Sequence, residues 1–252
     1  MRASERPIAA KCSSSHQRNR RLPSQRDIFL ASEGDSFFSR NREKLNPAQD
    51  RPATNHLISF LAKAGRSIDQ VTEIGCGNGS ELLKICAALD CEGIGVEPSA
   101  EAVAHGNQLA SEMNIAAKLV KGTAESLPQP DETADVVLFG FCLYLIDRRL
   151  VLPAMGEAYR ILKPGGFLAI VDFDPAANHR RAYAHLRGLW SFKQDYARIP
   201  LATGWFSLAA KIPLSHAGEG FEPVSYERVA LTILYKELEP YPVWTEETAP
   251  GS

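Results

Sequence analysis

VTEIGCGNGS, residues 71–80, joins a short apolar run to a segment whose apolar residues recur at helical spacing. Its three glycines, Gly75, Gly77 and Gly79, alternate with other residues. Glycine allows a backbone to turn tightly and to approach a ligand closely. A strand, a glycine turn and a helix in this order form the binding end of many α/β domains. The stretch therefore predicts a ligand-binding turn between a strand and a helix.

The spacing of the glycines distinguishes between ligand classes. A phosphate-binding P-loop ends in Lys followed by Ser or Thr, and no such pair follows this turn. A dinucleotide fingerprint needs a third glycine, which would fall on Ser80 or on Leu82, depending on the starting glycine. What fits is an acidic residue, Glu73, two positions before an alternating glycine turn. A nicotinamide oxidoreductase is therefore disfavoured.

A cationic ligand without a phosphate suits this turn. A pyrophosphate is attracted to the positive N-terminus of a helix. S-adenosylmethionine instead carries an ammonium and a sulfonium group, which a carboxylate such as Glu73 attracts. Glu97 follows Gly75 by 22 residues and ends the next expected strand, in G-V-E-P at 95–98. An acid in that place can accept hydrogen bonds from both ribose hydroxyls.

Strands and helices alternate around the turn. Strands are expected at 71–74, 93–97, 117–121, 135–139 and 167–173, and helices at 54–64, 80–89, 99–113 and 148–162. This alternation predicts a mostly parallel α/β sheet with helices on both faces. Two later strands, at 211–215 and 228–235, are expected to form a terminal antiparallel hairpin that completes seven strands. Residues 175–205 are interpreted as an insertion over the carboxyl edge of the sheet.

The net charge of −2 over 252 residues hides an uneven distribution. Residues 1–26 hold seven Lys and Arg against one acid, so the remainder has a net charge of −8. An acidic body disfavours nucleic acid as a partner. The sequence has no run of about 18 apolar residues, so no membrane-spanning helix is expected. Residues 1–26 are interpreted as a disordered tail, although their composition also resembles a transit peptide. We expect a lid and helix at 27–65, a binding domain at 66–238 and an irregular tail at 239–252.

Five cysteines occur, at positions 12, 76, 86, 91 and 142, without a C-x-x-C pair. This odd number is typical of a reducing compartment and favours neither a disulfide framework nor a zinc site. We therefore expect a cytoplasmic protein. Asp172 and Asp174 alone do not form the carboxylate cluster of a metal-dependent enzyme, so no metal is expected.

Four motifs in residues 71–173 together resemble the core of the class I S-adenosylmethionine-dependent methyltransferases. They are E-I-G-C-G-N-G at 73–79, G-V-E-P at 95–98, G-T-A-E-S-L-P at 122–128 and L-K-P-G-G at 162–166. The resemblance implies a Rossmann-like fold, S-adenosylmethionine as cofactor and S-adenosylhomocysteine as product. It makes residues 66–238 a methyltransferase domain.

The same resemblance implies a set of cofactor-binding residues. The turn residues Gly75, Cys76, Gly77 and Gly79 would line the methionine part and the ribose. Glu73 would hold the amino end, and Glu97 with Pro98 would bind the ribose. Ala124 and Glu125 would meet the adenine, and Phe139 would lie with Gly140 beside the transferable methyl group.

The flanks resemble a narrower group. E-G-D-S-F-F-S-R-N at 33–41 is similar to the entry segment of methyltransferases associated with bacterial surface-glycan and flagellin-glycan gene clusters. Those enzymes also resemble this chain at D-F-D-P, residues 172–175, and around Tyr183 and His185. The resemblance implies a sugar or glycan precursor as acceptor. Arg40 and Asn41 would hold the methionine carboxylate from the lid, although a polar pair at a helix end explains them equally well.

Methyl transfer needs a base only where the acceptor is a hydroxyl, an acidic carbon or a protonated amine. His185 and Asp172 are the candidates, with Tyr144 third, and each can instead be structural. F-G-F-C at 139–142 differs from the [DN]-P-P-[YF] of enzymes that methylate amino groups of nucleic acids, so a small molecule is the expected partner. Two alternatives stay open. One is a lipid or quinone intermediate as acceptor, which an apolar pocket under residues 175–215 would favour, and the other is a non-catalytic cofactor-binding subunit.

Overall fold

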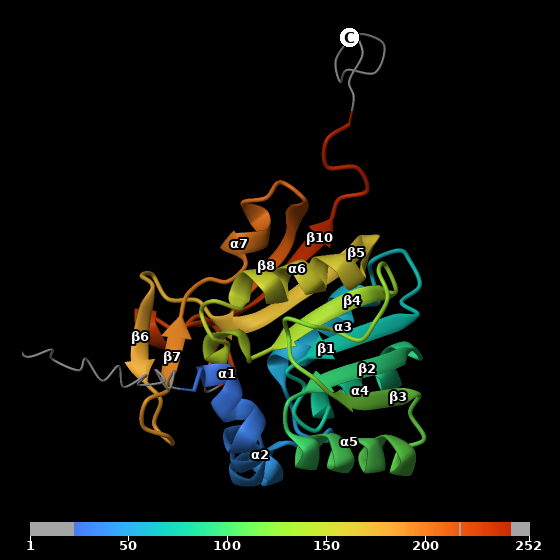
Figure 1. Ribbon diagram of the computed structural model, residues 1–252. Coiled ribbons are helices and arrows are strands. Elements are labelled where there is room, and N and C mark those ends of the chain that lie inside the picture. The colour runs from blue at the N-terminus through green and yellow to red at the C-terminus, as the bar shows by residue number, and fades with distance from the viewer. Residues whose placement is uncertain (1–22, 217, 243–252) are drawn as a thin grey trace, which may run out of the picture.

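The structure is a computed structural model that describes residues 23–216 and 218–242. A central twisted sheet crosses the domain, with helices on both faces (Figure 1). The tails expected at 1–26 and 239–252 lie for the most part outside the described residues.

The secondary structure contains one large sheet and a separate hairpin. The strands of the sheet are β1 (Gln70–Ile74), β2 (Glu92–Glu97), β3 (Ala117–Lys121), β4 (Ala134–Gly140), β5 (Leu162–Phe173), β8 (Phe206–Ser215), β9 (Gly218–Glu219) and β10 (Val229–Lys236). The hairpin is formed by β6 (His179–Ala182) and β7 (Trp190–Lys193). The α-helices are α1 (Gln25–Ile28), α2 (Gly34–Asn41), α3 (Pro52–Leu61), α4 (Ser80–Leu89), α5 (Ala100–Glu112), α6 (Val151–Ile161) and α7 (Arg198–Leu201). Short helical turns are η1 (Phe29–Glu33), η2 (Arg42–Lys44), η3 (Leu143–Leu145) and η4 (Ser225–Glu227).

The strand order is β3-β2-β1-β4-β5-β10-β8-β9. The pairs from β3 to β5 are parallel, whereas β10 is antiparallel to both of its neighbours, β5 and β8. The predicted seven-stranded, mostly parallel sheet is confirmed, and the two-residue β9 is added at its edge. β8 begins at Phe206 rather than at residue 211. Its first half was missed because residues 207–209 are exposed and give no buried alternation.

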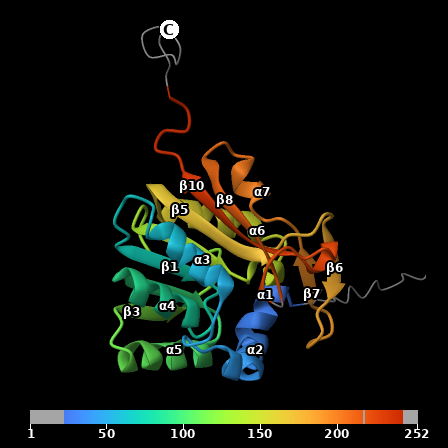
Figure 2. The same cartoon turned by 180° about the vertical axis from the view of Figure 1, so that it is seen from behind.

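Two apolar clusters hold the helices against the sheet. On one face, Leu57 of α3 and Leu82 of α4 pack together, and on the other face Met155 of α6 packs over the strands. Figure 2 shows α3 and α4 on the face opposite α6. β4 lies in the middle, with Val136 in one cluster and Val137 in the other. Burial on both faces explains why this strand is a continuous apolar run.

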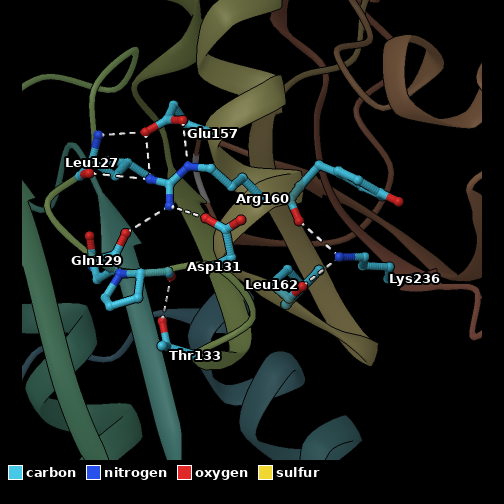
Figure 3. Close-up of polar contacts among 10 residues, drawn as sticks. Leu127, Gln129, Asp131, Thr133, Glu157, Arg160, Leu162 and Lys236 are labelled. Atoms are coloured by element: carbon cyan, nitrogen blue, oxygen red, sulfur yellow. Dashed lines mark hydrogen bonds and ion pairs between the residues drawn. The ribbon is translucent and has the colours of Figure 1, made fainter.

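Arg160, near the end of α6, fixes the loop that leads into β4 (Figure 3). Its guanidinium donates to the carbonyl oxygens of Leu127 (3.2 Å) and Gln129 (2.8 Å) and to the carboxylates of Glu157 (2.7 Å) and Asp131 (2.9 Å). Glu157 also accepts the amide hydrogen of Leu127, at 2.8 Å. This network helps to position residues 122–125, which precede the loop and line the cavity at the edge of the sheet.

The segment interpreted as an insertion contains a β-hairpin. β6 and β7 pair antiparallel, from His179 with Lys193 to Ala182 with Trp190. Lys193 is buried, with its ammonium 3.8 Å from the centre of the Phe173 ring, and this contact attaches the hairpin to the end of β5. Arg180 lies over the Trp190 ring at 4.3 Å. The aromatic and basic residues of this segment therefore largely serve the hairpin itself.

Residues 25–41 form a helical strap of α1, η1 and α2 that runs between α5 and the β6–β7 hairpin (Figure 1). The amide of Gln25 donates to the carbonyl oxygens of Leu145 (2.5 Å) and Trp190 (3.0 Å). Asp35 accepts from the hydroxyl of Ser99, at 2.6 Å, at the start of α5. The strap corresponds to the predicted lid, but it begins earlier than expected, because residues 25 and 26 belong to α1 and not to the tail.

We expect deletion of residues 1–22 to leave the melting temperature unchanged within about 2 °C, because the helical cap of the strap begins at Ser24. Deletion of residues 1–28 removes α1 and the contacts of Gln25, and should lower the melting temperature by several degrees. Thermal unfolding of both truncations checks the boundary. Equal melting temperatures for the two would show that α1 contributes nothing to the fold.

Candidate active site

A cavity of about 650 Å³ opens at one edge of the sheet. The carboxyl ends of β1, β2, β4 and β5 meet there. Because β10 runs opposite to β5, and β8 runs opposite to β10, the end of β8 and the start of β10 reach the same edge, where Val229 pairs with Leu214 and Phe173. The strap residues Phe29, Phe37 and Asn41 line the opposite wall. The size is within the usual range for small-molecule sites.

The glycine turn forms the floor of this cavity. Gly75, Gly77 and Gly79 have positive φ angles of 70°, 55° and 70°, which glycine adopts without strain. Gly75, Cys76 and Gly77 line the cavity, whereas Gly79 does not. Gly79 instead precedes α4 and faces Leu119, whose side chain would lie 3.2 Å from an added Cβ. Its role is to allow the close contact between α4 and β3.

Glu73 places a buried carboxyl group in the cavity wall. The side chain is 2% exposed, and its Oε2 accepts the amide hydrogen of Leu82 at 3.1 Å. Its Oε1 lies against Gly140, where an added Cβ would be only 2.4 Å away. Burial, reinforced by the nearby Glu81, raises the pKa of Glu73 well above its usual range. A bound ammonium group would offset this cost, because an opposite charge favours the ionised form.

Glu97 joins the glycine turn to the next helix. It is 8% exposed and accepts two amide hydrogens at 2.9 Å, from Gly77 and from Ser99. Burial raises its pKa, while these two hydrogen bonds oppose the rise. Each carboxylate oxygen can accept a further hydrogen bond, so Glu97 has free acceptor capacity for two ligand hydroxyls. Pro98 lines the cavity next to it.

Residues 122–125 form the wall expected to meet a flat heterocycle. Ala124 and Glu125 both line the cavity. The carboxylate of Glu125 forms an ion pair with the Nε of Arg26, at 2.5 Å, and Arg26 lines the cavity as well. No sequence pattern marks Arg26 as a site residue, because it stands among the basic residues of the expected tail.

The placement of Phe139 in the site is wrong. Its side chain is fully buried in the core, and the cavity is lined by Gly140 and Phe141 instead. Successive side chains of a strand point to opposite faces, so the last residues of β4 divide between core and cavity. Phe141 has a positive φ of 59°, and this unusual conformation belongs to the turn that brings its ring to the cavity.

Arg40 and Asn41 have different environments. Arg40 does not line the cavity; it forms an ion pair with the buried Glu33 and donates to the hydroxyl of Tyr183 at 3.2 Å. Tyr183 in turn donates to Glu33 at 2.9 Å. Arg40 therefore connects the strap to the hairpin. Asn41 does line the cavity, with its amide donating to the carbonyl oxygen of Phe37 at 2.8 Å.

Of the three predicted bases, one lines the cavity. His185 is exposed on the hairpin, where it packs against Tyr183. Asp172 lies below the cavity wall, 3% exposed, and accepts the amide hydrogens of Tyr144 (3.2 Å) and Phe173 (2.7 Å). Tyr144 does line the cavity, but burial raises the pKa of its hydroxyl, so it stays protonated at neutral pH. His216, after the end of β8, also lines the cavity and was not among the candidates.

Asp172 should make the stability of the protein depend on pH. Burial raises its pKa to about 7, whereas an unfolded Asp titrates near 3.9. Between about pH 4 and 7 the folded chain holds a proton that the unfolded chain has released. The free energy of unfolding therefore falls as pH rises through this window, by on the order of 3 kcal/mol. Asp172→Asn should lack this fall, measured by chemical denaturation at pH 5 and pH 8.

Asp90→Asn is the matched control, because Asp90 is exposed and its left-handed conformation, φ 52°, suits Asn. It should keep the pH dependence of the parent protein. If Asp172→Asn keeps that dependence too, the carboxyl of Asp172 does not titrate in this window.

Neither a metal-binding group of side chains nor a membrane-spanning helix occurs in the part of the chain that the structure describes. Within residues 23–216 and 218–242, no group of three or more His, Cys, Asp and Glu side chains is arranged to hold a metal ion. No helix among these residues is long and apolar enough to cross a bilayer.

The segment that contains the glycine turn matches a known protein family. Residues 71–166 match the family described as "Methyltransferase domain". A 27-O-demethylrifamycin SV methyltransferase of Amycolatopsis mediterranei is 34% identical over 129 residues, which cover 48% of this chain and 45% of that protein. A demethylmenaquinone methyltransferase of Listeria monocytogenes is 29% identical over 145 residues, covering 52% and 59%. The chain thus spans about half the length of these relatives.

Solved structures share the fold at low sequence identity. The 1,6-didemethyltoxoflavin-N1-methyltransferase of Burkholderia thailandensis, solved with 1,6-didemethyltoxoflavin and S-adenosylhomocysteine, has a TM-score of 0.64 at 15% identity and covers 93% of both chains. The [4+2]-cyclase SpnF has a TM-score of 0.65 at 17% identity, covering 86% of this chain and 97% of its own. Because one neighbour is a cyclase, the fold alone does not determine the reaction. The chain has the Rossmann-like fold of the class I methyltransferases, and its residues 71–166 match the methyltransferase-domain family.

Proposed function

We propose that the protein transfers a methyl group from S-adenosylmethionine to a small molecule. The observation that carries this proposal is the pair of buried carboxyl groups, Glu73 and Glu97, on either side of a cavity floored by Gly75 and Gly77. Glu73 suits an ammonium group, and Glu97 suits two hydroxyls. A phosphate would be repelled by both. The methyltransferase-domain match over residues 71–166 supports the same reading.

The residues of the site have distinct parts in this reaction. The cofactor, when bound, supplies an activated methyl group on a sulfonium sulfur. Glu73 and the amides of the glycine turn would hold its amino-acid end, Glu97 its ribose, and residues 122–125 its heterocycle. Because the methyl donor is already activated, holding donor and acceptor in line provides much of the rate. The strap, which lines the cavity through Phe29 and Phe37, would exclude water.

The acceptor is proposed to be an apolar, ring-bearing metabolite rather than a sugar. Where β5, β8 and β10 meet the cavity, the apolar part of the lining consists of Val171, Leu214 and Val229, with the rings of Phe141 and Tyr144 beside them. None of the polar or aromatic side chains of residues 179–198, among them Tyr183 and His185 of the glycan-cluster resemblance, lines the cavity. The apolar wall fits the alternative of a lipid or quinone-like acceptor. The names of the rifamycin and menaquinone methyltransferases agree with it.

Calorimetric titration of the purified protein with S-adenosylhomocysteine and, separately, NAD tests the cofactor. We expect micromolar binding of the first and none of the second. Absence of S-adenosylhomocysteine binding would contradict the proposed function. Transfer of a labelled methyl group to naphthoquinols or to nucleotide sugars then tests the acceptor class, and transfer to the sugars alone would restore the original prediction. Binding without transfer to either would favour a non-catalytic subunit.

A further inference from the structure

His216 stands at the acceptor end of the cavity, on the side away from Glu73 and Glu97. β8 is antiparallel to β10, so the residue that follows Ser215 is delivered to the carboxyl edge of β5. The imidazole lines the cavity and packs against Phe141 and Phe173, with ring centres 5.5 Å and 5.2 Å away. The methionine, ribose and heterocycle subsites lie over β1, β2 and the 122–125 loop. His216 therefore faces the part of the cavity left for the acceptor.

A carboxylate stands beside the imidazole. The Oε2 of Glu227, in η4, is 3.8 Å from the Nε2 of His216. Glu227 is itself held by Arg181 of β6, at 3.1 Å, and lies 3.7 Å from the ammonium of Lys193. At this distance the carboxylate stabilises the imidazolium that forms when the ring takes up a proton. The arrangement therefore suits a base.

Three aromatic rings form a cluster at this end of the cavity, and two of them, Phe141 and Phe173, pack against the imidazole. Phe141, Tyr144 and Phe173 contact one another with ring centres 5.0 to 5.3 Å apart, in tilted and edge-on arrangements. Phe141 and Tyr144 line the cavity. Aromatic side chains stack well on flat rings, while the apolar side chains of Val171 and Leu214 give a sugar hydroxyl no partner. The wall is suited to a flat ring that presents one polar group to His216.

We infer that His216 is a catalytic base for the proposed transfer, and that its acceptor is a planar ring carrying a hydroxyl group. This rests on the proposed function. The acceptor O–H bond breaks and its proton moves to a ring nitrogen of His216. The oxygen forms a bond with the methyl carbon, and the carbon–sulfur bond breaks with its electron pair staying on the sulfur, which becomes a neutral thioether. The imidazolium beside Glu227 then releases the proton to solvent.

The surroundings of His216 keep it ready to take up a proton. Burial and the positive charge of Lys193 lower the pKa of His216, whereas Glu227 and Glu222 raise it, and the net direction is downward. Tyr144, the remaining titratable group of the ring cluster, stays protonated and uncharged. Asp172, below the cluster, faces the amide hydrogens of Tyr144 and Phe173 instead. The neutral, proton-accepting form of His216 therefore prevails at pH 7.

Binding of 2-naphthol to the protein saturated with S-adenosylhomocysteine is the first test. We expect 2-naphthol to bind at least about tenfold more tightly than naphthalene, which lacks the hydroxyl, because one hydrogen bond of this kind is worth roughly that factor. In His216→Gln the naphthalene affinity should stay unchanged. Failure of the parent protein to bind 2-naphthol, or equal affinities for the two compounds, would overturn the inferred acceptor class.

Methyl transfer to 2-naphthol is the second test. His216→Gln should lower kcat by about 100-fold and leave KM within about threefold, since Gln can still accept a hydrogen bond but cannot take the proton. His179→Gln is the matched control, because His179 lies on β6 and does not line the cavity; it should keep the parent kcat. An unchanged kcat in His216→Gln would remove His216 from the reaction.

Glu227→Gln gives a reading that does not depend on the His216 substitution. Removing its charge should shift the acidic limb of the kcat profile to lower pH, because Glu227 raises the pKa of His216. An unmoved limb would contradict the role of His216 as base. Binding of S-adenosylhomocysteine is measured for every variant. Absence of this binding in the parent protein would count against the proposed function. Normal binding in His216→Gln together with unchanged methyl transfer would count against the role of His216 alone.

Discussion

Gly75→Ala is expected to abolish measurable binding of S-adenosylhomocysteine and to lower the melting temperature by roughly 10 °C. Gly75 has a φ of 70°, where a side chain costs about 1–2 kcal/mol. An added Cβ would also lie 2.6 Å from the Cβ of Cys142 and 2.8 Å from its sulfur. Neither atom belongs to a flexible chain end, so the turn itself must move, and overpacking adds about 1–3 kcal/mol. Calorimetry and thermal unfolding measure the two effects.

Gly65→Ala is the matched control for backbone strain. Gly65 has nearly the same φ, 71°, but nothing lies within 4 Å of an added Cβ. It should lose about 1–2 kcal/mol of stability and keep full cofactor affinity. Adding Cys142→Gly to Gly75→Ala should restore part of the binding, because it removes the colliding atoms. If Gly75→Ala behaves like Gly65→Ala, the contact with Cys142 is unimportant.

Glu97→Ala is expected to weaken binding of S-adenosylhomocysteine by about 100-fold. The substitution removes the acceptor for the proposed ribose hydroxyls and leaves the buried amides of Gly77 and Ser99 without their partner. Two charge-assisted hydrogen bonds of this kind are together worth about 3 kcal/mol, which is a factor of about 100 in affinity. Titration calorimetry of the variant gives the affinity directly.

Glu101→Ala is the control for Glu97, since Glu101 is an exposed acid in the first turn of α5. It should bind S-adenosylhomocysteine like the parent protein. An unchanged affinity in Glu97→Ala would place the ribose elsewhere. A loss of affinity in both variants would point to long-range charge instead of a direct contact.

The proposed cofactor half of the site could be predicted from the sequence because its residues lie close together in the chain. Glu73 and Gly75 are separated by two positions, so a strand followed by a tight turn brings them together without any knowledge of distant segments. Glu97 could be added because parallel strands deliver their carboxyl ends to the same edge.

The residues of the proposed acceptor half could not be predicted from the sequence in this way. His216 reaches the cavity only because β8 runs in the same direction as β5 and lies two strands from it, beyond the antiparallel β10, a placement that no short motif encodes. Phe139 was assigned to the wrong face because a continuous apolar strand gives no alternation to set its parity. Arg26 contacts Glu125 only because the strap passes beside the cavity, and no sequence pattern predicts that contact. Each of these contacts joins segments far apart in the chain.

The position of β10 has a consequence for how the chain folds as it leaves the ribosome. β8 is made before β10, yet its long partner in the sheet is β10, which inserts between β5 and β8. Until residues 229–236 have emerged, β5 and β8 each present an unpaired edge, and nascent chains with such edges are prone to aggregate. His216 cannot be delivered to the cavity before that moment. The proposed cofactor half of the pocket can therefore form during synthesis, whereas the acceptor half forms only when β10 has paired with β5 and β8.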